Sequence, residues 1–264
     1  MGKRRDYAER ANALGLPRFY YPHAARPPLY WDGVVEPVHP HAASFVTAEG
    51  HRLVMEAYGY PYPVHVTGWG LCKQRPFRSP APKDRPRVLF GPIHPGYNSW
   101  LAPELITANQ RAYCMLLTLF WEGKIELSVR HVENLAKNGL FPVEGVGYEQ
   151  SARELRVQQL DAFDVVVSHQ TLAYLAIARG IPTLMYAEHL TPSSGNSPAS
   201  FVYVASWDAY RELLTYPLDL FSGPALDMLE AAMQPNEDVA RWRELFIGGG
   251  FEATRFVDLI EANL

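Results

Sequence analysis

The sequence predicts an α/β fold whose main sheet is mostly parallel. Over residues 87–187, short apolar runs of strand length alternate with segments that have the periodicity of helices. Strands this apolar are buried on both faces, which requires helices on each side of a parallel sheet. The chain has 264 residues, of which 48% are hydrophobic and 20% are charged, and this composition excludes a disordered or fibrous protein.

The main sheet and the helices that follow it are expected to form one domain over residues 87–264. Strands are expected at 87–91, 125–132, 164–168 and 182–187, with helices at 103–121, 151–160 and 171–179 between them. Gly180 is expected to close the last of these helices. The C-terminal part is predominantly helical, with helices expected at 208–214, 224–233, 238–246 and 251–263.

The first 72 residues are expected to form a smaller, reduced α/β segment. Strand signals at 44–47 and 64–67 flank a helical pattern at 49–58, which ends at Gly59. This order is a strand, a helix and a second strand. A helical pattern at 4–14 and a strand signal at 18–21 come before it.

Residues 73–86 are expected to be a linker, because they are basic and rich in proline. Residues 1–88 hold 13 Lys and Arg against 7 Asp and Glu, a net charge of +6, whereas the remaining residues hold 11 against 21, a net charge of −10. Two interpretations of Lys73, Arg75 and Arg78 are open. These residues either keep an exposed linker soluble or face an anionic acceptor.

The sequence predicts no membrane span, no secretion signal and no disulfide framework. The longest apolar stretch, at residues 115–121, is far shorter than the roughly 20 residues of a membrane-spanning helix. The first residues are charged and polar with no apolar segment behind them, so the cytoplasm is the expected compartment. Cys72 and Cys114 stand apart in apolar or aromatic surroundings, which predicts two reduced, buried thiols.

Polar side chains gather just after the ends of four predicted strands. In an open α/β sheet, ligands bind in the crevice beyond the carboxyl ends of the strands, so a site is expected at these positions. Ordinary turn residues would be typical of a sheet without a ligand. The candidates for binding a nucleotide and its diphosphate are His94, Gly96, Asn98, Arg130, Ser168, His169, Gln170, Thr171 and Glu188.

The turn at residues 168–171 leads into a helix, whose free backbone N–H groups and positive end could hold a phosphate. The alternative is that Ser168 or Thr171 only caps the helix. Glu188 could accept hydrogen bonds from two ribose hydroxyls, or it is an exposed acid in a loop. The loop at 92–99 has neither a P-loop nor a GxGxxG pattern, which argues against ATP hydrolysis and a nicotinamide cofactor.

A family resemblance lies in residues 164–186, which read DVVVSHQTLAYLAIARGIPTLMY. They resemble the nucleotide-binding half of GT-B glycosyltransferases, which carries a similar strand, a turn of the His-Gly-Ser/Thr type, a helix of small apolar residues and Gly-x-Pro before the next strand. Residues 87–95 are similar to the first strand of that half, so the resemblance covers about residues 86–190. It implies a Rossmann-like domain that binds the diphosphate of a donor nucleotide-sugar, usually linked to UDP.

The chain departs from the family pattern in three ways. Gln170 stands where the family often has glycine, and Ala176 lies near where many members have a glutamate. Recognition of the ribose or the sugar would then pass to another residue, such as Glu188. The N-terminal part, which the resemblance assigns to the acceptor, is also shorter than a complete acceptor domain.

The resemblance implies an enzyme that moves a sugar from a nucleotide-diphosphate donor to a hydroxyl acceptor. Such a transfer needs a base for the hydroxyl and stabilisation of the charge on the leaving diphosphate. His23 is the candidate base, with an ordinary histidine in an aromatic loop as the alternative, and His94 and Arg130 are candidates for the diphosphate. No DxD signature follows a strand, so no metal is expected, and no cofactor besides the donor.

The basic N-terminal side would suit a polyanionic acceptor, such as a hydroxylated base in DNA or a phosphorylated glycan. Two competing hypotheses are open. In one, the chain is a nucleotide-binding half-enzyme that needs a partner subunit or a second copy of itself. In the other, it is a nucleotide-sugar epimerase or hydrolase, because these enzymes share the layout of the fold and differ in the site.

Overall fold

The chain divides into two compact units in the computed structural model. Unit 1 comprises Met1–Lys73, Pro192–Leu214 and Trp242–Leu264, and unit 2 comprises Gln74–Thr191 and Thr215–Arg241. Residues 74–86, expected to be part of a linker, therefore belong to unit 2. Residues 242–264, expected to belong to the same domain as residues 87–241, belong to unit 1. The structure describes residues 10–11, 13–17, 19–20, 43–57, 62–70, 74–80, 83–92, 102–130, 135–136, 139–149, 157–168, 170–186 and 215–262.

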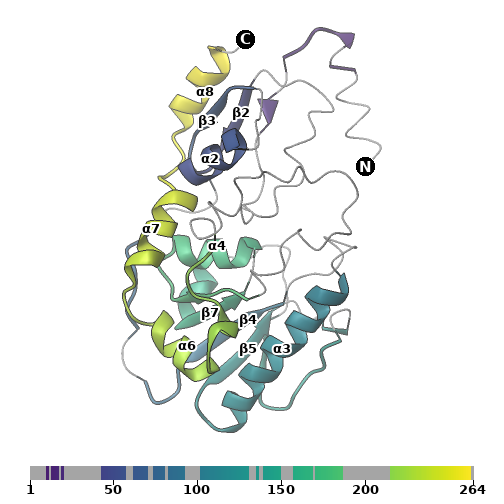
Figure 1. Cartoon of the computed structure of the whole chain (residues 1–264), viewed down its shortest axis with the longest axis vertical. Coiled ribbons are helices and arrows are strands. Elements are labelled where there is room, and N and C mark those ends of the chain that lie inside the picture. Colours follow the sequence, from purple (N-terminus) through teal and green to yellow (C-terminus); the bar gives the residue numbers. More distant parts are fainter. Residues whose placement is uncertain are drawn as a thin grey trace. The chain divides into compact units, whose positions relative to one another are not determined.

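Unit 2 contains a parallel sheet of five strands in the order β6–β5–β4–β7–β8. Figure 1 labels its three central strands, β5, β4 and β7. The α/β class and the parallel sheet predicted from the sequence are confirmed. The strand β6 is not among the predicted strands, because its three residues include a glycine and form no apolar run. The strands span Arg87–Gly91 (β4), Glu126–Arg130 (β5), Gly147–Glu149 (β6), Val165–Ser168 (β7) and Thr183–Leu184 (β8).

Helices cover both faces of this sheet. The helix α3 spans Ala102–Trp121 and α4 spans Gln170–Ala178. Phe90 of β4 stacks on Tyr113 of α3, with 5.9 Å between ring centroids. A Cβ on the next residue, Gly91, would instead meet Leu172 of α4. Successive strand residues point to opposite faces, so α3 and α4 lie on opposite sides of β4.

The end of α4 is fixed by a glycine turn. Gly180 has φ of +72° and donates its N–H to the Ile177 carbonyl, while the Ile181 N–H donates to the Ala176 carbonyl. These two bonds form a Schellman motif, whose left-handed residue is most easily a glycine. The prediction that Gly180 closes this helix is confirmed.

Shorter helices complete the described part of unit 2. The residues before β7 form a 3-10 helix, η5 (Val157–Ala162), where the sequence predicts the end of an α-helix. A second 3-10 helix, η6 (Leu220–Ser222), begins where the Asp219 carboxylate accepts the Phe221 N–H at 2.7 Å. The helix α6 (Ala225–Ala232) follows and contacts both α3 and β8. The first six residues of the helix predicted at 151–160, and all of the helix predicted at 208–214, lie outside the described residues.

Unit 1 contains a second parallel sheet, with strands β1 (Phe19–Tyr20), β2 (Ala43–Val46) and β3 (Val64–Val66) in chain order. The helix α2 (Glu49–Ala57) connects β2 to β3, which confirms the predicted strand–helix–strand order. The helix α8 (Ala253–Glu261) belongs to this unit, and its Phe256 ring lies 4.8 Å from that of Phe45. The helix α7 (Glu237–Phe246) contains the division between the units.

Cys114 is exposed on α3, so the prediction of a buried thiol is wrong at this position. Residues four apart share a helix face, so Cys114 lies on the same face of α3 as Gln110 and Thr118. Both of these residues are exposed as well. Cys72 lies outside the described residues. Among the helices that the structure describes, none is both long enough and apolar enough to cross a membrane.

Candidate functional site

The chain changes direction across the five-stranded sheet between β4 and β7. From β4 it steps outward to β5 and β6, and it then returns to the other side of β4 for β7 and β8. The carboxyl ends of β4 and β7 therefore form a topological switch point, where open α/β sheets bind their ligands. Gly91 and Ser168 are the last residues of these strands and are register partners.

The structure places Arg130, Ser168 and Gln170 at this carboxyl edge. Arg130 ends β5, directly after the Phe90–Val129 pair of β4 and β5, and only 8% of its surface is exposed. The helix α4 begins at Gln170, two residues after Ser168. A guanidinium and the N–H groups of a helix N-terminus both favour an anion. The edge thus combines two features that suit a diphosphate.

Several other predicted site residues lie outside the described part of the chain, and their roles stay predictions. They are His23, Lys73, His94, Gly96, Asn98, His169 and Glu188. Gln170 and Thr171 are described only as the first two residues of α4. In the part of the chain that is described, no three His, Cys, Asp or Glu side chains gather to hold a metal ion.

The Ser168 side chain is directed at the backbone of β4. Its Oγ donates to the Gly91 carbonyl at 2.9 Å, and 2% of the residue is exposed. A hydroxyl carries one proton, so this bond uses the proton that a phosphate contact would need. The bond ties the end of β7 to the end of β4, while the phosphate contact predicted for Ser168 stays a prediction.

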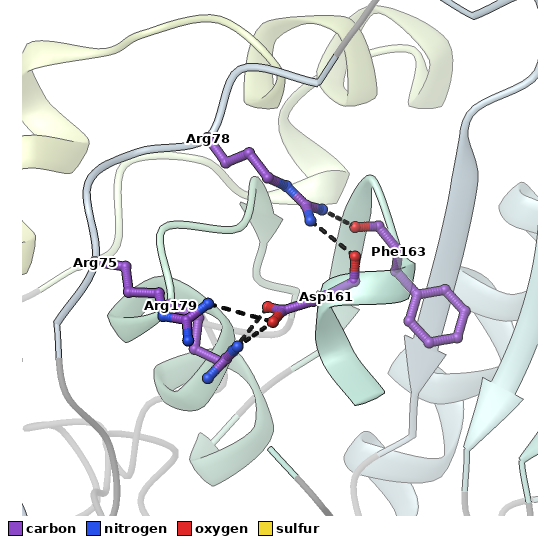
Figure 2. Close-up of polar contacts among 5 residues, drawn as sticks. All are labelled: Arg75, Arg78, Asp161, Phe163 and Arg179. Carbon is purple, nitrogen blue, oxygen red and sulfur yellow. Dashed lines mark hydrogen bonds and ion pairs between the residues drawn. The ribbon is translucent and has the colours of Figure 1, made fainter. Parts of the chain in front are cut away.

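Arg75 and Arg78 lie at the opposite, amino-terminal edge of the same sheet, because both bond to residues just before β7. Figure 2 shows these contacts. Arg78 donates from Nη1 to the Asp161 carbonyl at 2.8 Å and from Nη2 to the Phe163 carbonyl. Arg75 donates to the Asp161 carboxylate at 3.3 Å, and Arg179 donates to both oxygens of that carboxylate. Asp161 and Phe163 come just before β7, so this cluster lies at the start of the strand and not at its end.

The arginines change the acidity of Asp161. The hydrogen bond from Arg179 holds the pKa of this carboxyl below its usual value, and the charges of Arg179, Arg75 and Arg78 lower the pKa further. Partial burial acts in the opposite direction but does not outweigh them. Asp161 is therefore ionised at neutral pH and pairs with a guanidinium whose side chain is only 7% exposed.

Residues 74–80 form a strap along unit 2. The Arg75 N–H donates to the Ala178 carbonyl at 2.8 Å, and the Arg78 N–H donates to the Gly180 carbonyl at 2.7 Å. The strap passes so close to α4 that a Cβ on Gly180 would lie 1.9 Å from the Pro76 carbonyl oxygen. The expected linker is thus hydrogen-bonded to unit 2 over these residues, while residues 74–76 and 79 are exposed. The acceptor contact predicted for Arg75 and Arg78 stays a prediction.

Two buried polar residues at the carboxyl edge, Asn109 and Tyr186, are not among the predicted site residues. The Tyr186 hydroxyl lies 3.0 Å from the Gly91 carbonyl oxygen and 2.8 Å from Asn109 Oδ1. A signal for Asn109 exists in the sequence. It shares one face of α3 with the buried residues Ala112 and Tyr113, and an amide on an apolar face needs a partner.

The chain matches no protein-family model and no curated protein sequence. Solved structures do match it. The GtfA/B complex is 12% identical, with 84% of this chain and 46% of that chain covered and a TM-score of 0.38. The pneumococcal O-GlcNAc transferase GtfA in complex with UDP and GlcNAc is 11% identical, with 89% and 47% covered and a TM-score of 0.40. The spinosyn rhamnosyltransferase SpnG, complexed with spinosyn aglycone, is 13% identical, with 95% and 69% covered and a TM-score of 0.44.

Two of these solved structures are of glycosyltransferases by name, an O-GlcNAc transferase and a rhamnosyltransferase. The chain spans less than half the length of the GtfA/B chain and of pneumococcal GtfA.

Proposed function

We propose that the chain is a glycosyltransferase that binds a nucleotide-diphosphate sugar, with UDP as the expected nucleotide, at the carboxyl edge of the five-stranded sheet. The observation that carries this proposal is the switch point between β4 and β7, next to which Arg130 is buried at the end of β5. Nucleotides bind to open α/β sheets at such points. The diphosphate would lie near Arg130 and the N-terminus of α4.

The residues at this edge suit the leaving group of a sugar transfer. The reaction breaks the bond between the anomeric carbon and the diphosphate oxygen and joins that carbon to the acceptor oxygen, whose proton passes to a base. Arg130, which is protonated at any ordinary pH, and the N–H groups of α4 would stabilise the negative charge on the departing nucleoside diphosphate. With this charge already provided, we expect the transfer to need no metal ion. His23 is our candidate for the base.

Thermal unfolding with UDP, CDP, GDP and ADP tests the donor site, because a ligand that binds only the native state stabilises it by mass action. We expect UDP to raise Tm the most. Arg130→Gln should weaken UDP binding about tenfold or more, because a hydrogen bond to a charged group contributes about 1.5–3 kcal/mol.

Arg87→Gln is the matched control. Arg87 begins β4 at the amino edge of the same sheet, with 47% of its side chain exposed, so its loss should leave UDP binding unchanged. If no nucleotide shifts Tm, or if UDP binds Arg130→Gln as tightly as the unaltered protein, the proposed site is wrong.

Release of UDP from UDP-sugars, with and without hydroxyl acceptors, tests the reaction itself. A transferase should release UDP faster when an acceptor is present and should yield a glycosylated product. Free sugar or an altered nucleotide-sugar without any acceptor would instead identify a hydrolase or an epimerase. An undiminished rate in EDTA would support transfer without a metal.

A polyanionic acceptor, such as DNA with a hydroxylated base or a phosphorylated glycan, is a finer part of the proposal. Its support is the net charge of +6 on residues 1–88. Arg75 and Arg78, which also donate hydrogen bonds within unit 2, are the candidates for this contact together with Lys73. Transfer to a polyanion should fall steeply with added salt, since counterions compete for the phosphates. Equal rates at low and high salt would contradict it.

A second candidate function is a nucleotide-binding half-enzyme. One of the solved structures to which the chain is similar, GtfA/B, is a complex. In this alternative, the chain binds the nucleotide but transfers sugar only together with a partner subunit or a second copy of itself. Light scattering on the active protein decides between the two, because an active monomer excludes the need for a partner.

A further inference from the structure

A buried network of neutral side chains surrounds the Gly91 carbonyl at the end of β4. This oxygen lies 2.9 Å from Ser168 Oγ and 3.0 Å from the Tyr186 hydroxyl, which is also 2.8 Å from Asn109 Oδ1. Ser168 is 2% exposed, and Tyr186 and Asn109 are fully buried. The network therefore joins the end of β4, the end of β7, the residues after β8 and the helix α3.

The donors and acceptors of the network can be assigned from their chemistry. A phenol carries one proton, so Tyr186 donates either to the Gly91 carbonyl or to Asn109 Oδ1 at any moment. The Ser168 hydroxyl donates to the Gly91 carbonyl in both cases. Because Asn109 comes from α3, its amide oxygen holds the phenol next to the strand end. Gly91 thus has two side-chain donors that come from opposite ends of the segment 168–186.

Gly91 also touches the first turn of α4. A Cβ at this position would lie 2.4 Å from Leu172 Cδ2 and 2.6 Å from Ser168 Oγ. A side chain here would displace the Leu172 methyl group and the Ser168 hydroxyl, so it would disturb the contact of β4 with α4 and the hydrogen bond from Ser168. The groups that hold Gly91 in place therefore act where the end of β4 meets the first turn of α4, next to the switch point.

We propose that Ser168 and Tyr186 are positioning residues for the nucleotide site, with Asn109 orienting Tyr186. They hold the Gly91 backbone where the chain leaves β4, directly before the segment that contains His94 and Asn98. This inference rests on the proposed function. It assigns to Ser168 a bond to the protein backbone in place of a bond to phosphate, and it gives a role at the site to Asn109 and Tyr186.

A pair of tyrosine variants separates positioning from plain stability. Tyr216 is buried like Tyr186, and its hydroxyl donates to the Thr183 carbonyl at 3.2 Å, at the start of β8. Tyr186→Phe and Tyr216→Phe each remove one neutral hydrogen bond to a backbone carbonyl, so both should lower Tm by similar amounts. Only Tyr186→Phe should weaken UDP binding, about fivefold, the equivalent of one neutral hydrogen bond.

Ser168→Ala removes the other hydroxyl that donates to the same carbonyl. We expect it to weaken UDP binding by a similar factor, and the double variant with Tyr186→Phe, which removes both side-chain donors, should weaken binding more than either single variant. Asn109→Ala should have a smaller effect, because the Tyr186 hydroxyl can still donate to the Gly91 carbonyl.

The outcomes distinguish this inference from the proposed function. If the unaltered protein binds UDP, but Tyr186→Phe and Ser168→Ala bind it as tightly as Tyr216→Phe does, the positioning role is overturned and the proposed function stands. If the unaltered protein binds no nucleotide, both are overturned. Weaker binding in Tyr186→Phe together with unchanged binding in Tyr216→Phe supports both.

Discussion

The two edges of the five-stranded sheet hold their polar groups in different ways. At the amino edge, charged side chains pair with one another: Asp161 with Arg179 and Arg75, and Lys83 with Asp164 at 2.9 Å. At the carboxyl edge, the contacts around Gly91 are made by a hydroxyl, a phenol and an amide, which are all neutral. The arginine at that edge, Arg130, is buried at the end of a strand.

This difference indicates where unit 2 uses charge for its own stability. The Asp161 carboxylate already accepts hydrogen bonds from two guanidinium groups, and the guanidinium of Arg179 is nearly buried, so this ion pair serves the fold. Neutral groups hold a backbone in place without cancelling the field of a nearby cation or helix N-terminus. The ion pairs at the amino edge stabilise unit 2, and the anion site that we propose lies at the carboxyl edge.

The largest expected effect comes from the close contact between the strap and α4. Gly180→Ala should destabilise unit 2 by about 3 kcal/mol, as measured by urea unfolding. A left-handed residue with a side chain costs about 1–2 kcal/mol, and a displaced neighbour adds about 1–3 kcal/mol. The displaced neighbour is the strap, because the new Cβ would meet the Pro76 carbonyl.

Gly123→Ala is the matched control for this prediction. Gly123 ends α3 with φ of +70° and the same pair of backbone bonds, but no neighbouring atom lies within 4 Å of its Cβ position. It should cost only the backbone part, about 1–2 kcal/mol. Equal losses for the two variants would contradict the binding of the strap to α4.

Asp161→Ala should have the next largest effect, about 2 kcal/mol at pH 7, because it leaves the nearly buried Arg179 without its carboxylate. The folded-state pKa of Asp161 is lowered, so its contribution is present above the unfolded pKa, which is about 4, and is lost as the pH falls through the folded pKa. The difference in unfolding free energy between the two proteins should shrink below about pH 4. Unfolding curves at neutral and acidic pH would contradict this if the difference stayed constant.

The smallest expected effects are those of Tyr186→Phe and Arg75→Ala, and salt should change only the second. Tyr186→Phe removes a neutral hydrogen bond and should cost about 1 kcal/mol at any salt concentration. Arg75→Ala removes a pair whose side chains are 55% and 37% exposed, which should cost about 0.5 kcal/mol at low salt. This cost should disappear near 1 M NaCl, where charges are screened beyond about 3 Å. Urea unfolding at two salt concentrations measures both, and a salt-dependent loss for Tyr186→Phe would contradict its neutral role.

Local signals predicted much of the fold and part of the candidate site. The apolar runs of β4, β5 and β7, the helical periodicity of α3 and the glycine that closes α4 are properties of short segments, and the structure has them where they are expected. The place of the polar residues was predictable too, because the residues that come just after a strand in sequence always lie at the carboxyl edge of a parallel sheet. Arg130 and Ser168 lie at that edge for this reason.

The tertiary structure alone decided the order of the strands and the partners of the polar groups. The switch point depends on β7 pairing with β4 and not with β6, and no local pattern in the sequence decides which strand β7 pairs with. Arg75 lies 86 residues from Asp161, and Tyr186 lies 95 residues from Gly91. The basic, proline-rich sequence of residues 74–80 is typical of a free linker, and only the fold brings the Asp161 carboxylate next to it. Periodicity reports which face of an element is buried, whereas long-range register determines which charges and hydroxyls meet there.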